Sequence, residues 1–109
     1  MADKTILLDS CVPRPFKREL HFYQVQHTSE IGWQDLDDRP LLEQADGSFD
    51  VLITVDQNLP YQQNLSRYQI SVIVLIARTN RLADLQPLVP PLVGVLATIG
   101  PGEMFEIRG

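Results

Sequence analysis

The chain has 109 residues, 44% of them hydrophobic and 21% charged, and this length predicts one domain over residues 1–109. A formal net charge of -5 excludes a diffuse basic surface that holds nucleic acid by counterion release alone. The single cysteine excludes an internal disulfide. The longest apolar run, residues 72–77, is far shorter than the roughly 20 residues that span a bilayer. We therefore expect no membrane insertion and, with no leader-like N-terminus, a cytoplasmic protein.

The first part of the chain predicts a strand, a helix and a second strand. Residues 5–8 are a short apolar run that ends in an aspartate and predicts the first strand. Pro13 and Pro15 indicate that a helix begins next, because the N–H groups of a first helical turn have no intrahelical partners. Residues 20–27 predict the second strand, and residues 29–37 predict a loop with one helical turn.

The middle of the chain predicts a helix and two buried strands. Residues 38–45 have apolar side chains at helical spacing, with Asp38 as a capping residue. Residues 51–55 and 70–77 are nearly unbroken apolar runs, which are typical of strands covered on both faces. The polar residues 56–68 between them predict a surface connection.

The last part of the chain predicts a helix and a strand. The helix extends over residues 81–99 and is interrupted by Pro87, Pro90 and Pro91, and residues 104–107 form the strand. Strands that alternate with helices in this way predict an α/β domain. We expect a three-layer α/β/α sandwich with a mainly parallel sheet.

Aspartates follow two of the predicted strands, and a third opens a predicted helix. Asp9 and Asp56 end their strands, and in open parallel sheets the functional crevice lies beyond the carboxyl ends of the strands. Clustered carboxylates are costly unless a cation neutralises them, and Mg²⁺ or Mn²⁺ suits such ligands. Asp38 is the natural third member. The alternative for each is a helix cap or a solvated loop acid.

Basic residues lie close to the first aspartate in the sequence. Arg14, Lys17 and Arg18 fall three and four positions apart and predict a local anion-binding face, with a solvated helix face as the alternative. Further arginines that would extend the same rim are Arg67, Arg78 and Arg81.

Other reactive side chains point to no specific chemistry. Cys11 lacks the arginine six positions on that a cysteine phosphatase needs, since Lys17 stands there. His21 and His27 lack zinc-ligand spacing and are expected to be ordinary strand histidines. Trp33 is expected to be a packing anchor rather than a platform for base stacking.

Several stretches together form a recognisable pattern: Ile6-Leu7-Leu8-Asp9 with Cys11-Val12-Pro13, then Gly32-Trp33, then Asp38 seven residues before Ala45, and then residues 49–59 and 61–65. This pattern, which extends from about residue 4 to residue 107, resembles the small PIN-like proteins. These are predicted nucleases related to VapC toxins of toxin–antitoxin systems. The most specific part of the resemblance is residues 49–65.

The resemblance implies a PIN-like sandwich whose acidic pocket binds Mg²⁺ or Mn²⁺ and hydrolyses RNA phosphodiesters. Asp9 matches the acid after the first strand, Asp38 the acid that opens the middle helix, and Asp56 the acid after the third strand. Asn58 matches a polar position two residues further on. An RNA substrate and a cognate antitoxin are the implied partners. Residues expected to contact the RNA are Arg14, Lys17, Arg18, Asn58, Gln62, Gln63 and Asn64.

Two departures from the family pattern leave a second function open. Many relatives have Glu or Asn after the first aspartate, where this chain has Ser10, and several have an acid where it has Pro40. A PIN-like domain with fewer ligands would act by binding an antitoxin rather than by catalysis. The apolar residues 88–99 are compatible with a homodimer contact or with a core helix.

A third reading is a phosphoacceptor receiver domain, with Asp56 as the phosphorylated residue and Thr79 at the hydroxyl position. Such a domain needs an acid pair after the first strand and a lysine after the last one. The lysines of this chain are Lys4 and Lys17, and Ser10 follows the first aspartate, so the sequence favours the nuclease.

Overall fold

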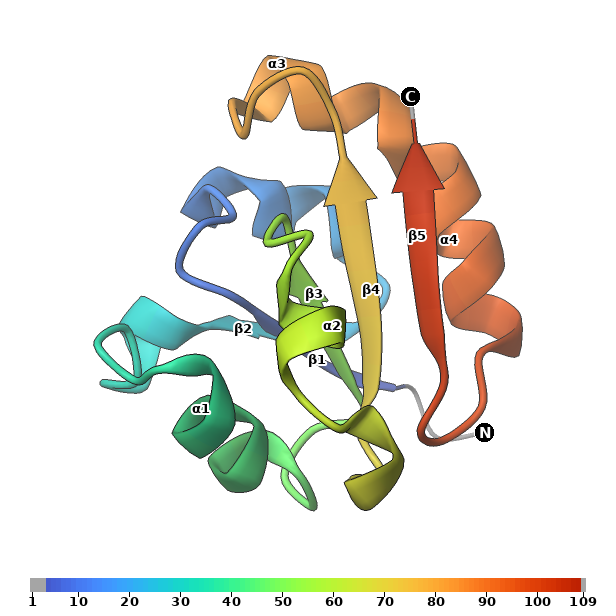
Figure 1. The fold of residues 1–109 in the computed structure, drawn as a ribbon. Coiled ribbons are helices and arrows are strands. Elements are labelled where there is room, and N and C mark those ends of the chain that lie inside the picture. Colours follow the sequence, from blue (N-terminus) through green and yellow to red (C-terminus); the bar gives the residue numbers. More distant parts are fainter. Residues whose placement is uncertain (1–3, 109) are drawn as a thin grey trace.

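A five-stranded, all-parallel sheet with helices on both faces forms the domain (Figure 1). The computed structural model describes residues 4–108. The strands are β1 (Thr5–Leu8), β2 (Gln24–His27), β3 (Val51–Thr54), β4 (Ser71–Ile76) and β5 (Met104–Arg108). The α-helices are α1 (Asp38–Ala45), α2 (Leu59–Gln62), α3 (Leu82–Leu85) and α4 (Val89–Thr98), and the 3-10 helices are η1 (Arg14–Leu20), η2 (Thr28–Glu30), η3 (Leu65–Arg67) and η4 (Gln86–Leu88).

Two hydrophobic clusters lie on opposite faces of the sheet. Alternate residues of each strand point to opposite faces, so Ile53 of β3 packs beneath η1 and α4 while Leu52 packs beneath α1 and α2. Every residue of β3 is buried. The predicted α/β architecture with continuous apolar strands and a parallel sheet is therefore confirmed.

Several predicted boundaries were wrong for local reasons. The first helix, η1, is a 3-10 helix and includes Leu20, which leaves only Gln24–His27 for β2. The surface connection at residues 56–68 contains α2 and η3, and Leu59 is fully buried because α2 packs on the sheet. The prolines at 90 and 91 lie in the first turn of α4 and do not interrupt it, since no backbone hydrogen bond is lost there.

The order of the strands determines where a site can form. Along the sheet the order is β2-β1-β3-β4-β5, so the chain moves from β1 to one side and then returns to add β3 on the other. In sheets of this order ligands bind at the carboxyl ends of the strands where the order reverses, here between β1 and β3. Asp9 directly follows β1, and its N–H donates to the Ile53 carbonyl at 2.9 Å. None of the helices within residues 4–108 has the length and hydropathy needed to cross a bilayer.

Candidate active site

Three aspartates from separate elements meet at the reversal between β1 and β3. Asp9 follows β1, Asp56 follows β3 and Asp38 is the first residue of α1, where Asp37 and not Asp38 is the N-cap. The pKa of Asp38 is raised, first by burial and then by the charges of Asp56 and Asp9, and its carboxyl group also contacts that of Asp56. The three acids are therefore close enough to repel one another when ionised.

Thr54 connects two of these aspartates, and sequence reasoning missed it. This last residue of β3 is fully buried. Its Oγ1 donates to Asp9 Oδ2 at 2.8 Å and accepts from the backbone N–H of Asp56 at 3.0 Å. The one available signal was a hydroxyl residue inside an apolar strand. The hydroxyl group sets the spacing between the strand ends of β1 and β3.

Further backbone hydrogen bonds orient the two strand-end carboxylates. The N–H of Ser10 donates to Asp9 Oδ1 at 2.7 Å, and the N–H of Asn58 donates to Asp56 Oδ1 at 2.9 Å. The Ser10 hydroxyl pairs with that of Thr28 at 2.7 Å. Asn58 therefore stands beside the acid cluster through its backbone, at the start of α2.

Replacing Thr54 by valine is expected to weaken Mn²⁺ binding at the acids by about 10- to 100-fold, because groups that orient metal ligands typically have effects of that size. The same change leaves the Asp56 N–H without its acceptor and should cost about 1–3 kcal/mol of stability. Calorimetric Mn²⁺ titration and thermal unfolding measure these two effects. Thr54→Ser restores the hydroxyl and should recover most of the metal affinity. Equal losses in the valine and serine variants would show that the hydroxyl does not orient the site.

Cys11 lies at the side of the acid cluster. Its Sγ is 3.7 Å from Asp9 Oδ2 and 3.4 Å from Thr54 Oγ1. Burial and the negative charge of Asp9 raise the pKa of this thiol. The group is held as a neutral thiol, which is the opposite of what an activated cysteine nucleophile requires.

The three carboxylates do not by themselves make a complete metal-binding group. Within residues 4–108 no group of three or more His, Cys, Asp or Glu side chains is placed so that it could hold a metal ion. Magnesium commonly uses only one or two protein carboxylates and completes its shell with water and substrate phosphates. The pKa of Asp38 is raised first by burial and then by the charges of Asp56 and Asp9, and a hard cation would offset the repulsion from those two charges. The carboxylate oxygens of Asp9, Asp38 and Asp56 are of the ligand type that Mg²⁺ and Mn²⁺ prefer.

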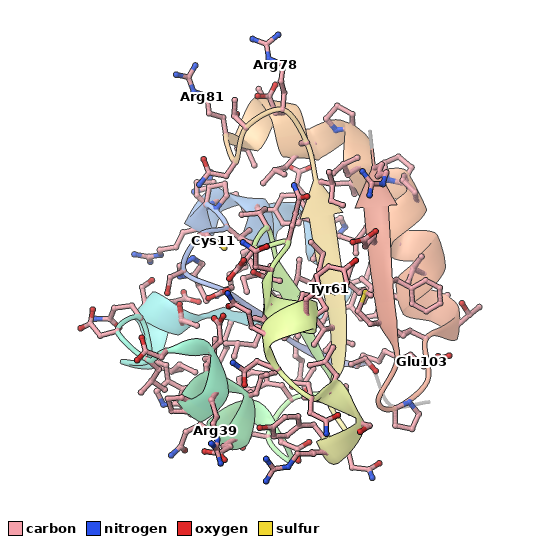
Figure 2. The ribbon with its side chains drawn as sticks, in the orientation of Figure 1. Cys11, Arg39, Tyr61, Arg78, Arg81 and Glu103 are labelled. Carbon is pink, nitrogen blue, oxygen red and sulfur yellow. The ribbon has the colours of Figure 1, made fainter. Side chains whose placement is uncertain are left out.

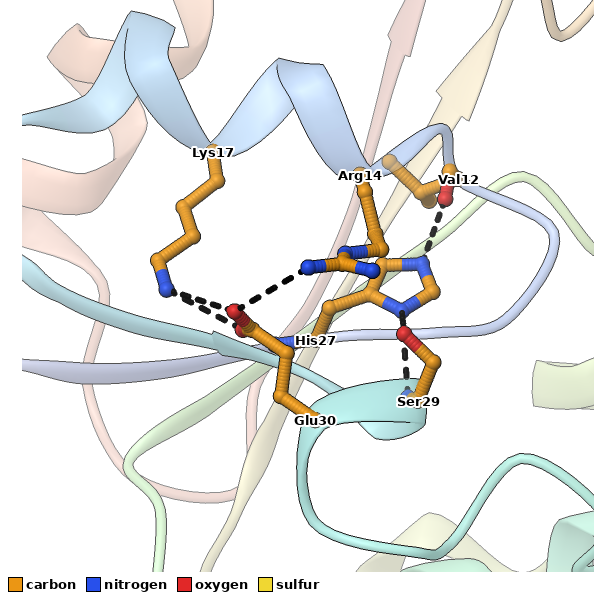
Figure 3. A network of polar contacts seen from close by, with 6 residues as sticks. All are labelled: Val12, Arg14, Lys17, His27, Ser29 and Glu30. Atoms are coloured by element: carbon orange, nitrogen blue, oxygen red, sulfur yellow. Dashed lines mark hydrogen bonds and ion pairs between the residues drawn. The ribbon is translucent and has the colours of Figure 1, made fainter.

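The predicted basic face is partly neutralised by Glu30, another residue that sequence reasoning missed (Figure 3). Lys17 Nζ lies 3.0 Å from both carboxylate oxygens of Glu30, and an Arg14 guanidinium nitrogen lies 3.9 Å from one of them. A hydrogen bond from the His27 N–H, followed by the contact with Lys17, lowers the pKa of Glu30. Arg18 joins these residues around a surface pocket of 390 Å³. The sequence signal for Glu30 was its place three residues after His27, the residue that caps η2.

His27 has a structural role, as expected for a strand histidine. It is buried at the end of β2, where its Nδ1 accepts from the Ser29 N–H at 3.1 Å and its Nε2 lies 2.7 Å from the Val12 carbonyl oxygen (Figure 3). Because a carbonyl only accepts, the ring proton is on Nε2. His21 differs from the prediction, since it follows η1 and is exposed.

The other residues predicted to contact RNA or to extend the basic rim lie on several different elements. Gln62 ends α2, and Gln63 and Asn64 follow it toward η3. Arg67 lies in η3, four residues before β4 begins, and so belongs to the amino edge of the sheet rather than to the rim. Figure 2 shows Arg78 and Arg81 beyond the carboxyl end of β4, with their side chains pointing away from the rest of the molecule.

Comparison with known proteins gives no relative: no family model, curated protein or solved structure matches the chain. Its class is defined by the fold and the site alone, as an α/β domain with a parallel sheet and an acidic cluster at the strand-order reversal.

Proposed function

We propose that this chain is a PIN-like, metal-dependent ribonuclease, the toxin component of a toxin–antitoxin system. The observation that carries the proposal is the convergence of Asp38 with Asp56 and Asp9 at the reversal between β1 and β3. The motif resemblance over residues 49–65 supports the same class.

Asp9, Asp38 and Asp56 would hold Mg²⁺ or Mn²⁺. Such an ion supplies an activated water and stabilises charge that develops on the scissile phosphate. Within the protein, Thr54 holds Asp9 in place, and the Asn58 N–H holds Asp56. Arg14, Lys17 and Arg18 would guide the RNA backbone, with Glu30 limiting their attraction for phosphate. Gln62, Gln63 and Asn64 would contact sugars or bases.

A PIN-like domain that binds an antitoxin without catalysis is the second candidate. The observation that favours it is that, within residues 4–108, no group of three or more His, Cys, Asp or Glu side chains could hold a metal ion. The Ser10 side chain hydrogen-bonds with the Thr28 hydroxyl and the Gln34 carbonyl, at a position where many PIN-like proteins have Glu or Asn. Pro40 occupies the first turn of α1 and is exposed.

A receiver domain has less support, although the strand order β2-β1-β3-β4-β5 is the one that receiver domains have. The Thr79 hydroxyl donates to Asp84 Oδ2 and accepts from the Arg81 N–H, so it serves the start of α3. The last strand ends at Arg108, where a receiver has a lysine near its carboxyl end. Incubation with a small phosphodonor and Mg²⁺ should leave Asp56 unmodified.

The decisive experiment combines metal binding with RNA cleavage. Calorimetric titration with Mn²⁺ should show binding, and the protein should cleave single-stranded RNA with Mn²⁺ or Mg²⁺ but not with EDTA. No heat at millimolar Mn²⁺ and no cleavage would favour the antitoxin-binding domain. Metal-independent cleavage that survives repurification would belong to the protein itself and would overturn the metal-dependent mechanism. Relief of the protein's toxicity by a neighbouring gene product would support the partner assignment.

A further inference from the structure

An uncharged groove lies beside the outer strand β2, away from the acid cluster. Its volume is 510 Å³. The lining residues are Thr5, Gln24, Val25, Gln26, Ile31, Trp33, Ser48 and Phe49. The lining itself holds no charged residue, and an acid that contacts it is the exposed Asp50, whose carboxylate accepts from the N–H and the hydroxyl of Thr5.

One wall of the groove is aromatic. Trp33 and Phe49 pack edge to face with ring centroids 6.0 Å apart and an interplanar angle of 79°. Trp33 is only partly buried, so the sequence-based expectation of a packing anchor describes just part of its surface. Aromatic side chains with exposed surface are the platforms on which unpaired bases stack.

The lining of the groove also includes two amide side chains. Gln24 and Gln26 are exposed and alternate along β2 with the buried Val25 and His27. Within residues 4–108 neither glutamine side chain makes a hydrogen bond. Each amide offers both donors and acceptors, which suits the edge of a nucleobase.

We propose that this groove binds a base of the single-stranded RNA whose backbone reaches the acid cluster. The inference rests on the proposed ribonuclease function and adds a base-binding subsite to it. Thr5 at the groove and Asp9 at the acids lie at the two ends of β1, about 13 Å apart at the usual rise of a strand. Single-strand sites on one domain commonly cover several nucleotides, so one RNA chain can reach both.

The groove and Asp38 also share a face of the sheet. Trp33, Phe49 and Ile31 pack against the same hydrophobic cluster as Leu41 of α1, the helix that Asp38 opens. The competing occupant is a peptide strand added to the open edge of β2. Aromatic rings and two exposed amides in the same lining favour a planar base with polar edges over a peptide.

Trp33 provides the measurement, because it is the one tryptophan in the chain. A single-stranded RNA hexanucleotide of mixed sequence, added with EDTA to prevent cleavage, should quench its fluorescence in a saturable way. The double variant Gln24→Leu, Gln26→Leu should bind about tenfold more weakly, the effect of losing about 1.4 kcal/mol of base-edge hydrogen bonding. The matched control is Gln86→Leu, in η4 on the opposite face, which should bind like the unmodified protein.

The outcomes separate the subsite from the catalytic proposal. Quenching that is unchanged in the glutamine double variant, or no quenching at all, overturns the subsite even if cleavage is observed. Quenching by a blocked β-forming hexapeptide and not by RNA also overturns it, in favour of a peptide-binding edge. Normal quenching in a protein that cleaves no RNA would retain the base subsite and reject the nuclease.

Discussion

Replacing Asp9 and Asp56 together by asparagine is expected to abolish metal-dependent RNA cleavage and to leave the fold intact. Asparagine has the shape of aspartate and keeps one acceptor oxygen, so the variant at position 56 can still accept from the Asn58 N–H and the variant at position 9 can still accept from Thr54, while the second acceptor that Asp9 offers to the Ser10 N–H is lost. What is lost is the pair of negative charges that a hard cation needs. Because removal of a single preorganised electrostatic group often costs 100-fold or more, we expect a fall of at least about 100-fold.

Cleavage of a labelled single-stranded RNA with Mn²⁺ measures this effect, and circular dichroism verifies the fold. The control Glu19→Gln, Glu43→Gln removes the same number of carboxylates from η1 and α1 away from the reversal, and it should cleave normally. Unchanged cleavage in the double aspartate variant would reject the assigned site. Equal losses in the control would indicate a general effect of net charge.

Asp38→Asn is expected to stabilise the protein at neutral pH while it weakens metal binding. Burial and the charges of Asp56 and Asp9 raise the pKa of Asp38 above the ordinary value of 3.8. A carboxyl group with a raised pKa in the folded state favours folding at pH values below its unfolded pKa, and this contribution is lost as the pH rises through the folded pKa. At pH 7 the ionised group therefore opposes folding, and asparagine removes that penalty.

Thermal unfolding of both proteins, with and without Mn²⁺, tests this prediction. Without metal the variant should have the higher Tm at pH 7, and the difference should shrink as the pH falls toward 3.8. Added Mn²⁺ should raise the Tm of the unmodified protein more than that of the variant. Asp35→Asn, in the exposed loop before α1, is the matched control and should change neither quantity. A lower Tm for Asp38→Asn at pH 7 would contradict the repulsion inferred here.

The layered fold and its acidic edge could be predicted from the sequence because both depend on strong local patterns. Two uninterrupted β-branched runs mark β3 and β4, and the aspartates that follow the strands are visible as soon as the strands are. Parallel strands then bring their carboxyl ends to one edge of the sheet. The sequence does not show that Asp38 lies close to Asp56, because this depends on where α1, which begins at Asp38, packs in the fold.

The features that were missed depend on tertiary contacts. Glu30 of η2 meets Lys17 of η1 only in the folded chain, where their side-chain charges lie 3.0 Å apart, and a charge count along the sequence does not show this pairing. The role of Thr54 depends on its hydrogen bonds with the Asp9 carboxylate and the Asp56 N–H, and the sequence does not show that these groups meet. The wall formed by Trp33 and Phe49 joins residues from two separate loops.

The parallel pairing of β1 with β3 has a consequence for when the protein becomes active. Asp9 and its partner Thr54 are separated by 45 positions in the sequence, and the segment between them contains β2 and the helices η1, η2 and α1. Contacts of such long range form late in folding because loop closure precedes any gain from them. A nascent or partly folded chain therefore lacks the assembled acidic edge, so any chemistry at this edge would begin only with the completed domain.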